Sequence, residues 1–541
     1  MSFDAEKVQR VLKKVPSLYR GPGGAVAVLK DGNLVGQHVW GYADMDRRIP
    51  ITSQVLFPIC SITKQFVSML LLDLVEKPPP SMTRQGLQEQ LLARLREVVP
   101  PEFVDESGLT VENLVDMCSG LRDYWALCTL QGSRPDTPYL LNEHNPDMLR
   151  RIRSLHFRPG YEYSYANTNF NVMERLIEHV TKDSLGNLFA ERIFGPAKMK
   201  TARLCPRTDR LPAPIVGYEG SEKFGFFPAP NFIEWSADAG LVASLDDMVA
   251  YEKHFDRRYT DQQDSYRDAI TPREYRDGAR AKYRYGLRHA DLGQYNTMGH
   301  GGALRGYKLM RRYVAGERLS VVVLFNHSAS APEAAEYILK QILDVSEPPP
   351  LAVQPVQQWF GSFLDPETQL SIRVRPGDVA GKIKIDYVRG EETLRLVDAN
   401  KAESPDVEAS IDGDILHVRR LDDNRVLTAR RLLKNHDAGA MIDRSQSPVQ
   451  GTYRCGETES TFICEGEGDM LYGLFDGCFG RGPPHLMTHL GEDVWVLADP
   501  RAMDDTPPGD WTVVFVRNEQ GAVVKANIGC WLARKLDFMK A

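Results

Sequence analysis

A proline-rich segment over residues 346–355 divides this sequence into two parts with different secondary-structure patterns. Its sequence, Ser-Glu-Pro-Pro-Pro-Leu-Ala-Val-Gln-Pro, is typical of a stiff linker between domains. Before it, apolar residues recur at helical spacing between short strand-like runs, whereas after it short alternating runs dominate. Because 541 residues exceed what one core can hold, we expect several domains. The pattern predicts an α+β domain over residues 1–340, a linker over 341–355 and an all-β part beyond.

The all-β part contains an internal sequence repeat. Residues 361–368, Gly-Ser-Phe-Leu-Asp-Pro-Glu-Thr, are matched by residues 451–458, Gly-Thr-Tyr-Arg-Cys-Gly-Glu-Thr, and each stretch precedes a strand pattern. We therefore expect two similar antiparallel modules, each a small closed barrel or sandwich, over residues 356–445 and 446–541.

The second module holds an unusually long connection. Between the strand-like runs 494–497 and 511–516, residues 498–510 form an acidic loop that is stiffened by prolines. A hairpin connection needs only a few residues, so the loop is either a disordered tip or a functional element.

The first part opens with a helix predicted over residues 3–18 and a hairpin at Asp31-Gly32. Apolar spacing also predicts helices over 109–121 and 170–180, and a buried strand over 319–325.

A Ser-x-x-Lys motif follows the hairpin, in Phe-Pro-Ile-Cys-Ser-Ile-Thr-Lys-Gln-Phe over residues 57–66. Apolar spacing predicts that a helix starts at Ser61, which places Lys64 on the same face three residues later. A neighbouring base can take the proton of a serine and make it a nucleophile. The motif alone equally fits a serine that caps the helix and a solvated lysine.

Two further motifs contain polar groups of the kinds that hydrolases use. Tyr165 and Asn167 stand in a loop before a helix; if that loop is extended, both side chains face one cleft. A phenol close to an ammonium can act as general base and acid, although an isolated Tyr-x-Asn usually marks a turn. His300 is followed by Gly301 and Gly302, which allow the backbone to approach a ligand. A lipase-type site would need a Gly-x-Ser-x-Gly motif, which the sequence lacks.

Charge and cysteine content exclude several function classes. The net charge of −7 and a sequence pI near 6.0 give no attraction to nucleic acid or anionic membranes. The charged N-terminus lacks the apolar run of a signal peptide, and no stretch reaches membrane-spanning length, so we expect a soluble intracellular protein. The 8 cysteines are scattered without the spacing of a zinc or redox site, which predicts reduced thiols. We expect no metal and no other cofactor.

In their order along the chain, the three motifs resemble those of the serine β-lactamase, DD-peptidase and penicillin-binding superfamily. Tyr-x-Asn as second motif and His-x-Gly in place of Lys-Thr-Gly are similar to its class C-like branch. Supporting matches stand at residues 40–44, 118–121, 159–160 and 239–241. The resemblance covers about residues 1–340 and implies an antiparallel sheet flanked by helices.

The whole chain resembles the bacterial D-aminopeptidase family, in which two β-barrel domains follow the catalytic one. Residues 58–66, 119–126, 299–306 and 529–534 carry this resemblance. It implies that Ser61 is the nucleophile and that Lys64 and Tyr165 share proton transfer. It further implies that Asn167 and His300 orient the substrate and polarise the site, His300 as a catalytic residue. The amides of Ser61 and Ala303, beside Gly302, are implied to form an oxyanion hole.

In that family a loop of the last domain reaches into the catalytic cleft, and residues 499–510 stand at the matching place. Asp504 is thereby implied to bind the free amino group of the substrate, although the adjacent Asp505 could do the same. A carboxylate that selects a free ammonium would explain an aminopeptidase.

The resemblance therefore predicts a cytoplasmic, homodimeric serine aminopeptidase that releases small N-terminal D-residues, such as D-Ala, from peptides, amides and esters through an acyl-enzyme. β-Lactams are expected as possible inhibitors, and neither nucleic acid nor membrane as a partner. One alternative is an esterase or a DD-peptidase or β-lactamase-like hydrolase of the same fold. Another is a non-hydrolytic protein that binds β-lactams or peptides.

Overall fold

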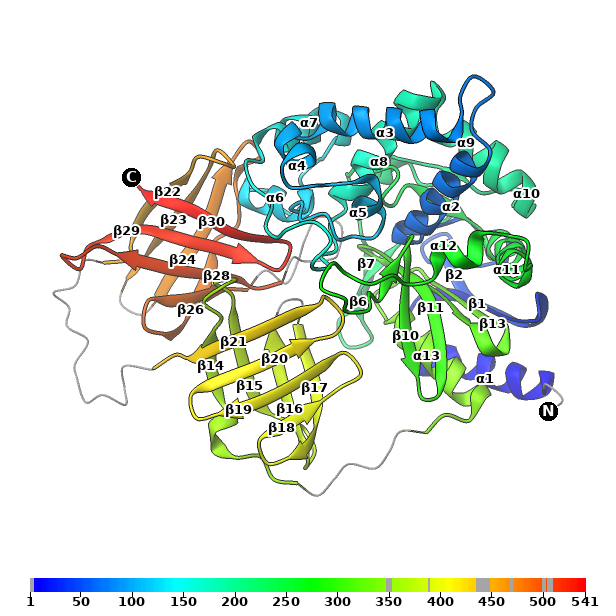
Figure 1. Ribbon diagram of the computed structural model, residues 1–541. Coiled ribbons are helices and arrows are strands. Elements are labelled where there is room, and N and C mark those ends of the chain that lie inside the picture. The colour runs from blue at the N-terminus through cyan, green and yellow to red at the C-terminus, as the bar shows by residue number, and fades with distance from the viewer. Residues whose placement is uncertain are drawn as a thin grey trace.

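A computed structural model describes residues 4–346, 353–387, 390–433, 448–467, 470–498, 503 and 509–541. Figure 1 shows a mixed helix and strand domain, coloured blue to green, beside two all-β units coloured yellow and orange to red. We call these the mixed domain, the first barrel and the second barrel. Residues 347–352 of the predicted linker lie outside the described residues.

The mixed domain is built on an eight-stranded antiparallel sheet in the order β3-β2-β1-β13-β12-β11-β10-β9. The predicted hairpin at Asp31-Gly32 joins its first two strands. The strands are β1 (Gly23–Lys30), β2 (Asn33–Asp44), β3 (Ile49–Pro50), β9 (Tyr283–Arg284), β10 (Leu287–Leu292), β11 (Tyr295–Leu304), β12 (Tyr307–Val314) and β13 (Leu319–Phe325). The predicted strand 319–325 is β13.

Helices cover both faces of this sheet. Successive residues of a strand point to opposite faces, and in β1 Val26 and Val28 pack toward α1 and α13 while Ala25 and Ala27 join the larger core on the other side. The helices are α1 (Ala5–Leu18), α2 (Thr63–Glu76), α3 (Arg84–Val98), α4 (Pro101–Asp105), α5 (Val111–Val115), α6 (Tyr124–Leu130), α7 (Leu141–Arg151), α8 (Thr168–Thr181), α9 (Leu185–Phe189), α10 (Gly195–Ala197), α11 (Leu245–Thr260), α12 (Tyr266–Ile270) and α13 (Ala331–Leu343).

Short elements complete the mixed domain. Three strands form a small sheet in the order β4-β8-β5, and two form a hairpin. These strands are β4 (Phe57–Pro58), β5 (Arg203–Leu204), β6 (Tyr218–Ser221), β7 (Gly225–Pro228) and β8 (Leu241–Ala243). The helical turns are η1 (Cys60–Ile62), η2 (Ala190–Phe194), η3 (Thr208–Arg210) and η4 (Ala315–Glu317), while η5 (Gln357–Trp359) precedes the first barrel.

The helix predicted over residues 109–121 is wrong in length, because the structure has only α5 there. Thr110 caps α5 by accepting a hydrogen bond from the backbone of Asn113. Two residues after α5 ends, Met117 has φ +56°, a left-handed conformation that stops a helix. The apolar residues beyond it are buried in a loop that reaches the start of α6.

Each all-β unit closes on itself. The first barrel has eight strands: β14 (Gly361–Leu364), β15 (Ser371–Pro376), β16 (Lys382–Tyr387), β17 (Gly390–Asp398), β18 (Lys401–Glu403), β19 (Val407–Asp412), β20 (Ile415–Arg420) and β21 (Arg425–Arg431). The second is closed by the pairing of β23 with β24. Its strands are β22 (Gly451–Cys455), β23 (Ser460–Glu467), β24 (Met470–Gly477), β25 (Gly480–Arg481), β26 (His485–Gly491), β27 (Val494–Leu497), β28 (Trp511–Arg517), β29 (Val523–Cys530) and β30 (Ala533–Lys540).

The internal repeat in the sequence is also present in the structure. Gly361 and Gly451 open the first strand of their barrels with nearly equal φ values of +146° and +144°. Because L-residues rarely adopt this conformation, glycine at the head of each repeat has a backbone reason.

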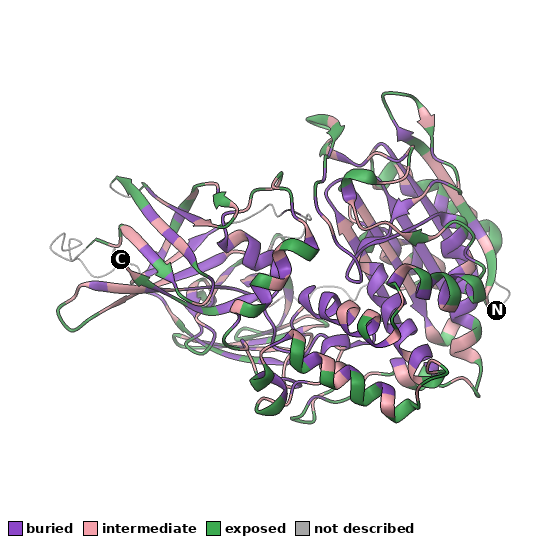
Figure 2. Ribbon diagram, turned by 90° about the horizontal axis from the view of Figure 1, so that it is seen from above, coloured by how far each residue is buried: buried purple, intermediate pink, exposed green. Residues whose placement is uncertain are grey.

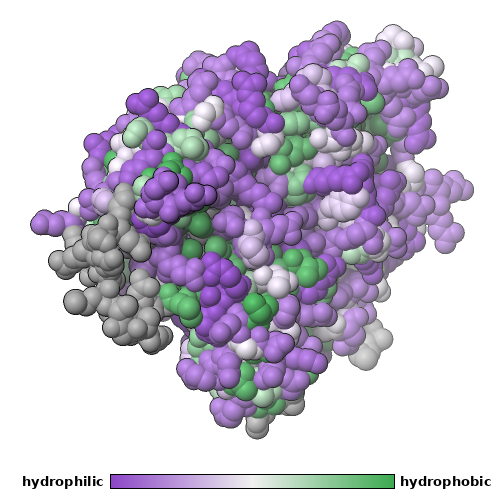
Figure 3. Space-filling model, turned by 60° about the vertical axis from the view of Figure 1, so that its left-hand side comes forward, coloured by the Kyte–Doolittle hydropathy of each residue, from purple (hydrophilic) through white to green (hydrophobic). Residues whose placement is uncertain are grey.

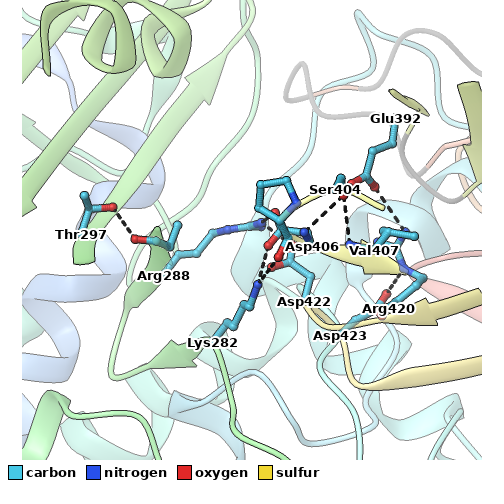
Figure 4. A network of polar contacts seen from close by, with 12 residues as sticks. Lys282, Arg288, Thr297, Glu392, Ser404, Asp406, Val407, Arg420, Asp422 and Asp423 are labelled. Carbon is cyan, nitrogen blue, oxygen red and sulfur yellow. Dashed lines mark hydrogen bonds and ion pairs between the residues drawn. The ribbon is translucent and has the colours of Figure 1, made fainter. Parts of the chain in front are cut away.

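The two barrels pack differently against the mixed domain. The first barrel has its own apolar core around Trp359, whereas apolar residues of the second barrel belong to one continuous cluster with the mixed domain. The first barrel is joined by ion pairs instead (Figure 4): Lys282 Nζ lies 2.6 Å and Arg288 Nη2 3.1 Å from the carboxylate of Asp406. Figure 2 shows that buried residues fill the interior of each unit.

On the face seen in Figure 3, hydrophilic residues predominate and hydrophobic ones lie in small groups, as is usual for a globular protein. None of the helices in the described part of the chain is long and apolar enough to cross a membrane.

Candidate active site

Ser61 lies at the junction of β4 and α2, in the turn η1. Cys60 before it has φ +49°, a strained conformation for a residue with a side chain. Lys64 stands one turn later, with Nζ 2.9 Å from Ser61 Oγ and 2.7 Å from the carbonyl oxygen of Asp238. Lys64 is fully buried while Ser61 is half-buried, so the lysine is held within the protein and the serine borders solvent.

Tyr165 is brought next to this pair. Its ring centroid lies 4.9 Å from Lys64 Nζ and 6.0 Å from the ring centroid of His300. The ring of Tyr165 therefore lies between the side chains of Lys64 and His300, and its predicted part in proton transfer stays a prediction.

Asn167 is oriented by its place at the start of α8. Its backbone is helical, with φ −60° and ψ −28°, so Asn167 does not have the extended conformation in which it would face the same side as Tyr165. Its backbone N–H donates to Asp123 Oδ1 at 2.6 Å, and its Nδ2 lies 3.5 Å from Asp123 Oδ2. Asp123 is a buried carboxylate that the sequence motifs do not include.

Gly302 and Ala303 lie at the end of β11 next to Ser61. The pairing of β10 with β11 ends at Gly299, and beyond it β11 runs against the Ile59–Cys60 backbone. A Cβ on Gly302 would lie 2.4 Å from the carbonyl oxygen of Ile59, so only glycine allows this approach. The backbone of Ala303 is thereby held near the helix start that carries Ser61.

His300 is buried and neutral. Its Nδ1 lies 2.6 Å from the carbonyl oxygen of Gly301, and its Nε2 lies 3.1 Å from the hydroxyl of Tyr283. Because a carbonyl only accepts, we infer that Nδ1 carries the proton and that Nε2 accepts from Tyr283. Burial, with the nearby charge of Lys64, lowers the pKa of His300 to about 3, so the imidazole is uncharged at neutral pH.

Motif analysis missed the residues that hold the motifs in place. Asp238 binds Lys64 through its carbonyl and accepts from the hydroxyl of Tyr124 at 2.6 Å through its carboxylate. Asp123 contacts Asn167, and Tyr283 contacts His300. Asp123 and Tyr124 stand within residues 119–126, and Asp238 directly precedes residues 239–241, two stretches that carry a family resemblance, whereas Tyr283 adjoins no motif.

The acidic loop is only partly described. Asp504 and Asp505 lie outside the described residues, so the structure does not test the role predicted for them. Met503 is buried in the apolar cluster that the mixed domain shares with the second barrel. Asp510, at the end of the loop, pairs at 2.6 Å with Arg373 of the first barrel.

Within the described residues, no group of three or more His, Cys, Asp and Glu side chains could hold a metal ion.

Family models match nearly the whole chain in two segments. One described as beta-lactamase covers residues 8–343, and one described as D-aminopeptidase, domain B, covers residues 352–539. The octameric penicillin-binding protein homologue from Pyrococcus abyssi is structurally similar, with a TM-score of 0.52 and 19% identity, over 79% of this chain and 100% of the other. The D-amino acid amidase from Ochrobactrum anthropi SV3 complexed with L-phenylalanine is also similar, with a TM-score of 0.50 and 19% identity. The match covers 63% of this chain and 99% of the amidase. The family model thus identifies the mixed domain as a β-lactamase domain, and the structural similarity shows that it shares its fold with a penicillin-binding protein homologue and an amidase.

Relatives that match along their full length define the family more narrowly. The D-aminopeptidase of Brucella melitensis biotype 2 is 38% identical over 539 residues, covering 100% of this chain and 99% of the relative. That of Brucella anthropi is 39% identical over 538 residues, covering 99% of both. The chain belongs to the D-aminopeptidase family, as its sequence motifs predict.

Proposed function

We propose that the protein is a serine aminopeptidase that hydrolyses N-terminal D-amino acids from peptides, amides and esters. Membership of the D-aminopeptidase family along the full chain is the observation that carries this proposal. The Ser61–Lys64 contact of 2.9 Å supports it, because a serine with a buried lysine at hydrogen-bond distance is equipped for acyl transfer.

The chemistry proceeds through an acyl-enzyme. Ser61 Oγ attacks the substrate carbonyl carbon while Lys64 and Tyr165 take its proton and pass it to the leaving amine. The carbonyl oxygen becomes negatively charged in this step, and the amides of Ser61 and Ala303 stabilise that charge. Water then attacks the ester carbon and gives up one proton to Lys64 and Tyr165; the C–O bond to Ser61 breaks, and that proton passes to Ser61 Oγ. The carboxylic acid product is the free D-amino acid.

Asn167 and neutral His300 orient the substrate in this proposal. An uncharged imidazole next to Lys64 adds no second positive charge to the site, which is consistent with orientation instead of proton donation by His300.

The second barrel supplies specificity in the same proposal, through residues 499–510. Asp504 or Asp505 pairs with the free α-ammonium and so selects substrates with an unblocked N-terminus. The attachment of the loop supports this, since buried Met503 and the Asp510–Arg373 ion pair fix described residues at two points along it.

Steady-state kinetics with the p-nitroanilides of D-alanine and L-alanine test the reaction. We expect a strong preference for the D-substrate and loss of turnover in Ser61→Ala. Equal rates for both enantiomers, or full activity in Ser61→Ala, would rule the proposal out. Preferential cleavage of N-acetyl-D-alanyl substrates would instead assign an esterase or a DD-peptidase-like hydrolase. Absence of turnover, with no covalent labelling of Ser61 by a fluorescent β-lactam or a phosphonate, would indicate a binding protein.

The loop is tested separately with Asp504→Asn and Asp505→Asn. Replacing the carboxylate that binds the ammonium lowers kcat/KM for free-amine substrates but not for N-acetyl ones. An unchanged ratio of the two kcat/KM values in both variants removes the loop from the mechanism.

We further propose that the protein is a cytoplasmic homodimer and that the parts of each chain have separate roles. Residues 1–340 carry catalysis, 341–355 link the domains, 356–445 form the first barrel and 446–541 the second. The family resemblance supports this proposal, and light scattering after size-exclusion chromatography measures the subunit number.

A further inference from the structure

One short segment of the mixed domain, residues 122–132, is bound to the second barrel at both ends. At its start, the backbone N–H of Asp123 donates to the carbonyl oxygen of Leu532 at 3.1 Å. The guanidinium of Arg122, buried to 2% exposure, lies 2.7 Å from Glu457 Oε1 and donates to the carbonyl of Arg534 at 3.2 Å. An arginine so deeply buried between two domains makes separation of the domains costly.

The far end of the segment is attached as closely. The side-chain and backbone oxygens of Gln131 accept from the backbone N–H groups of Cys478 and Phe479, at 2.9 and 3.0 Å. Gly132 has φ +79°, and a Cβ there would lie 1.7 Å from the carbonyl oxygen of Gly480. The helix α6 is therefore held at its two ends by barrel residues.

Asp123 and Tyr124, within this segment, make contacts on the opposite side, with the active-site residues. Asp123 accepts from the backbone of Asn167, and the N–H of Tyr124 donates at 2.9 Å to the hydroxyl of Thr168, which follows Asn167. The hydroxyl of Tyr124 holds Asp238, whose carbonyl accepts from Lys64. The same three residues, 122–124, thus link the second barrel to two of the catalytic motifs.

We propose that Asp123 is a positioning residue that holds Asn167 for substrate binding, and that the second barrel fixes Asp123 through Leu532, Arg534 and Glu457. The inference rests on the proposed function, because Asn167 acts there on a bound substrate. It assigns the last domain a role in the catalytic geometry that is separate from the loop 499–510.

Electrostatics agree with this geometry. Burial raises the pKa of Asp123 to about 7, and the hydrogen bond from Asn167 and the charge of Lys64 oppose that rise, whereas Asp238 adds to it. The carboxylate is thus stabilised by the residue that it holds. Replacing it leaves the N–H of Asn167 buried without its acceptor.

A double-mutant cycle separates positioning from a general structural effect. Asp123→Ala and Asn167→Ala are measured alone and together, on D-alanine p-nitroanilide. A displaced substrate group costs about 10²-fold in kcat/KM, so we expect a loss of that order in each single variant. If Asp123 acts through Asn167, the double variant loses no more than about threefold beyond either single one. Losses that multiply, or an Asp123→Ala variant within threefold of wild type, overturn the proposal.

The barrel contact is tested by Glu457→Gln, with Asp406→Asn as its matched control. Both changes remove one carboxylate from an ion pair between the mixed domain and a barrel, but only Glu457 leads to Asp123. We expect about a tenfold fall in kcat/KM for Glu457→Gln and less than twofold for Asp406→Asn. Equal effects of the two changes refute a specific role of the second barrel.

Two measurements keep the test independent of folding and of substrate. Asp123→Asn retains the shape and one acceptor oxygen, so it replaces Asp123→Ala in the cycle if the alanine variant does not fold. The cycle is repeated with the p-nitrophenyl ester of N-acetyl-D-alanine. If wild type cleaves only this ester, the aminopeptidase proposal fails, while additivity on the ester still decides the role of Asp123.

Discussion

The buried ion pair beneath the catalytic helix allows a quantitative test of how the mixed domain is stabilised. Arg311 on β12 binds Glu252 on α11 through two hydrogen bonds of 2.7 Å, and both side chains have 0% exposure. Arg311 also donates to Gln65, the residue after Lys64, and stacks on Phe255 at 4.4 Å. The pair therefore joins the sheet, α11 and the helix that carries the nucleophile.

Glu252→Gln removes one charge and keeps the shape. Since both side chains are fully buried, the charge of Arg311 is left in the core without its counter-charge, and we expect a loss of about 3–5 kcal/mol in the free energy of unfolding. The double variant Glu252→Leu with Arg311→Met removes both charges, and its loss should be smaller than that of Glu252→Gln. Glu6→Gln, in an exposed pair with Arg10, should cost at most about 1 kcal/mol.

Urea unfolding followed by circular dichroism measures these differences, and hydrogen exchange of the β12 amides assigns the transition to the mixed domain. A loss below about 1 kcal/mol for Glu252→Gln would refute the reasoning, because it would mean that water or another group compensates Arg311. A double variant less stable than Glu252→Gln would refute it too, by showing that the pair stabilises the fold beyond neutralising itself.

Three further results are expected. Gly302→Ala pushes a methyl group toward the carbonyl oxygen of Ile59, so kcat should fall about 10²-fold with the fold retained. Gly316→Ala, whose added group meets no atom within 4 Å beyond its own turn and chain neighbours, should keep full activity in the same assay. Tyr165→Phe should lower kcat about 10²- to 10⁴-fold with little change in KM, and equal kcat values would remove the phenol from proton transfer. Burial lowers the pKa of His327 to about 4, below its value in the unfolded chain. Its contribution to stability is therefore complete above about pH 6.5 and lost as the pH falls toward 4, and urea midpoints should drop less over this window in His327→Asn.

Local patterns were sufficient to predict much of the fold. The hairpin at Asp31-Gly32, α8 and the strand β13 occur where apolar spacing and turn residues predict them. The failure at 109–121 has a definite cause: its apolar residues are buried by neighbouring elements, so they mimic the helical spacing without continuing α5. Residues that are buried by tertiary contacts give the same apolar pattern in the sequence as the buried face of a helix.

For the candidate site, the sequence predicts some features and not others. Motifs identify groups whose neighbours are close in sequence, such as Ser61 and Lys64, because a helix fixes the geometry of residues three apart. His300 shows the limit of such reasoning. Its neutrality follows from burial and from Lys64, and its tautomer from Gly301 and Tyr283, none of which the motif specifies.

The contact between Arg122 and Glu457 shows why domain roles are hardest to infer from one sequence. The two residues are 335 positions apart, and Glu457 is the Glu of an internal repeat whose counterpart, Glu367, lies at an exposed turn. Repetition suggests equivalent residues, yet only the second copy faces a buried arginine. In our proposal Glu457 acts on Asn167 through Arg122 and Asp123. The second barrel therefore influences substrate binding by the way it packs against the mixed domain as well as through the loop 499–510. If Glu457→Gln lowers kcat/KM while Asp406→Asn does not, the two barrels have diverged in role through the surfaces that they present to the mixed domain.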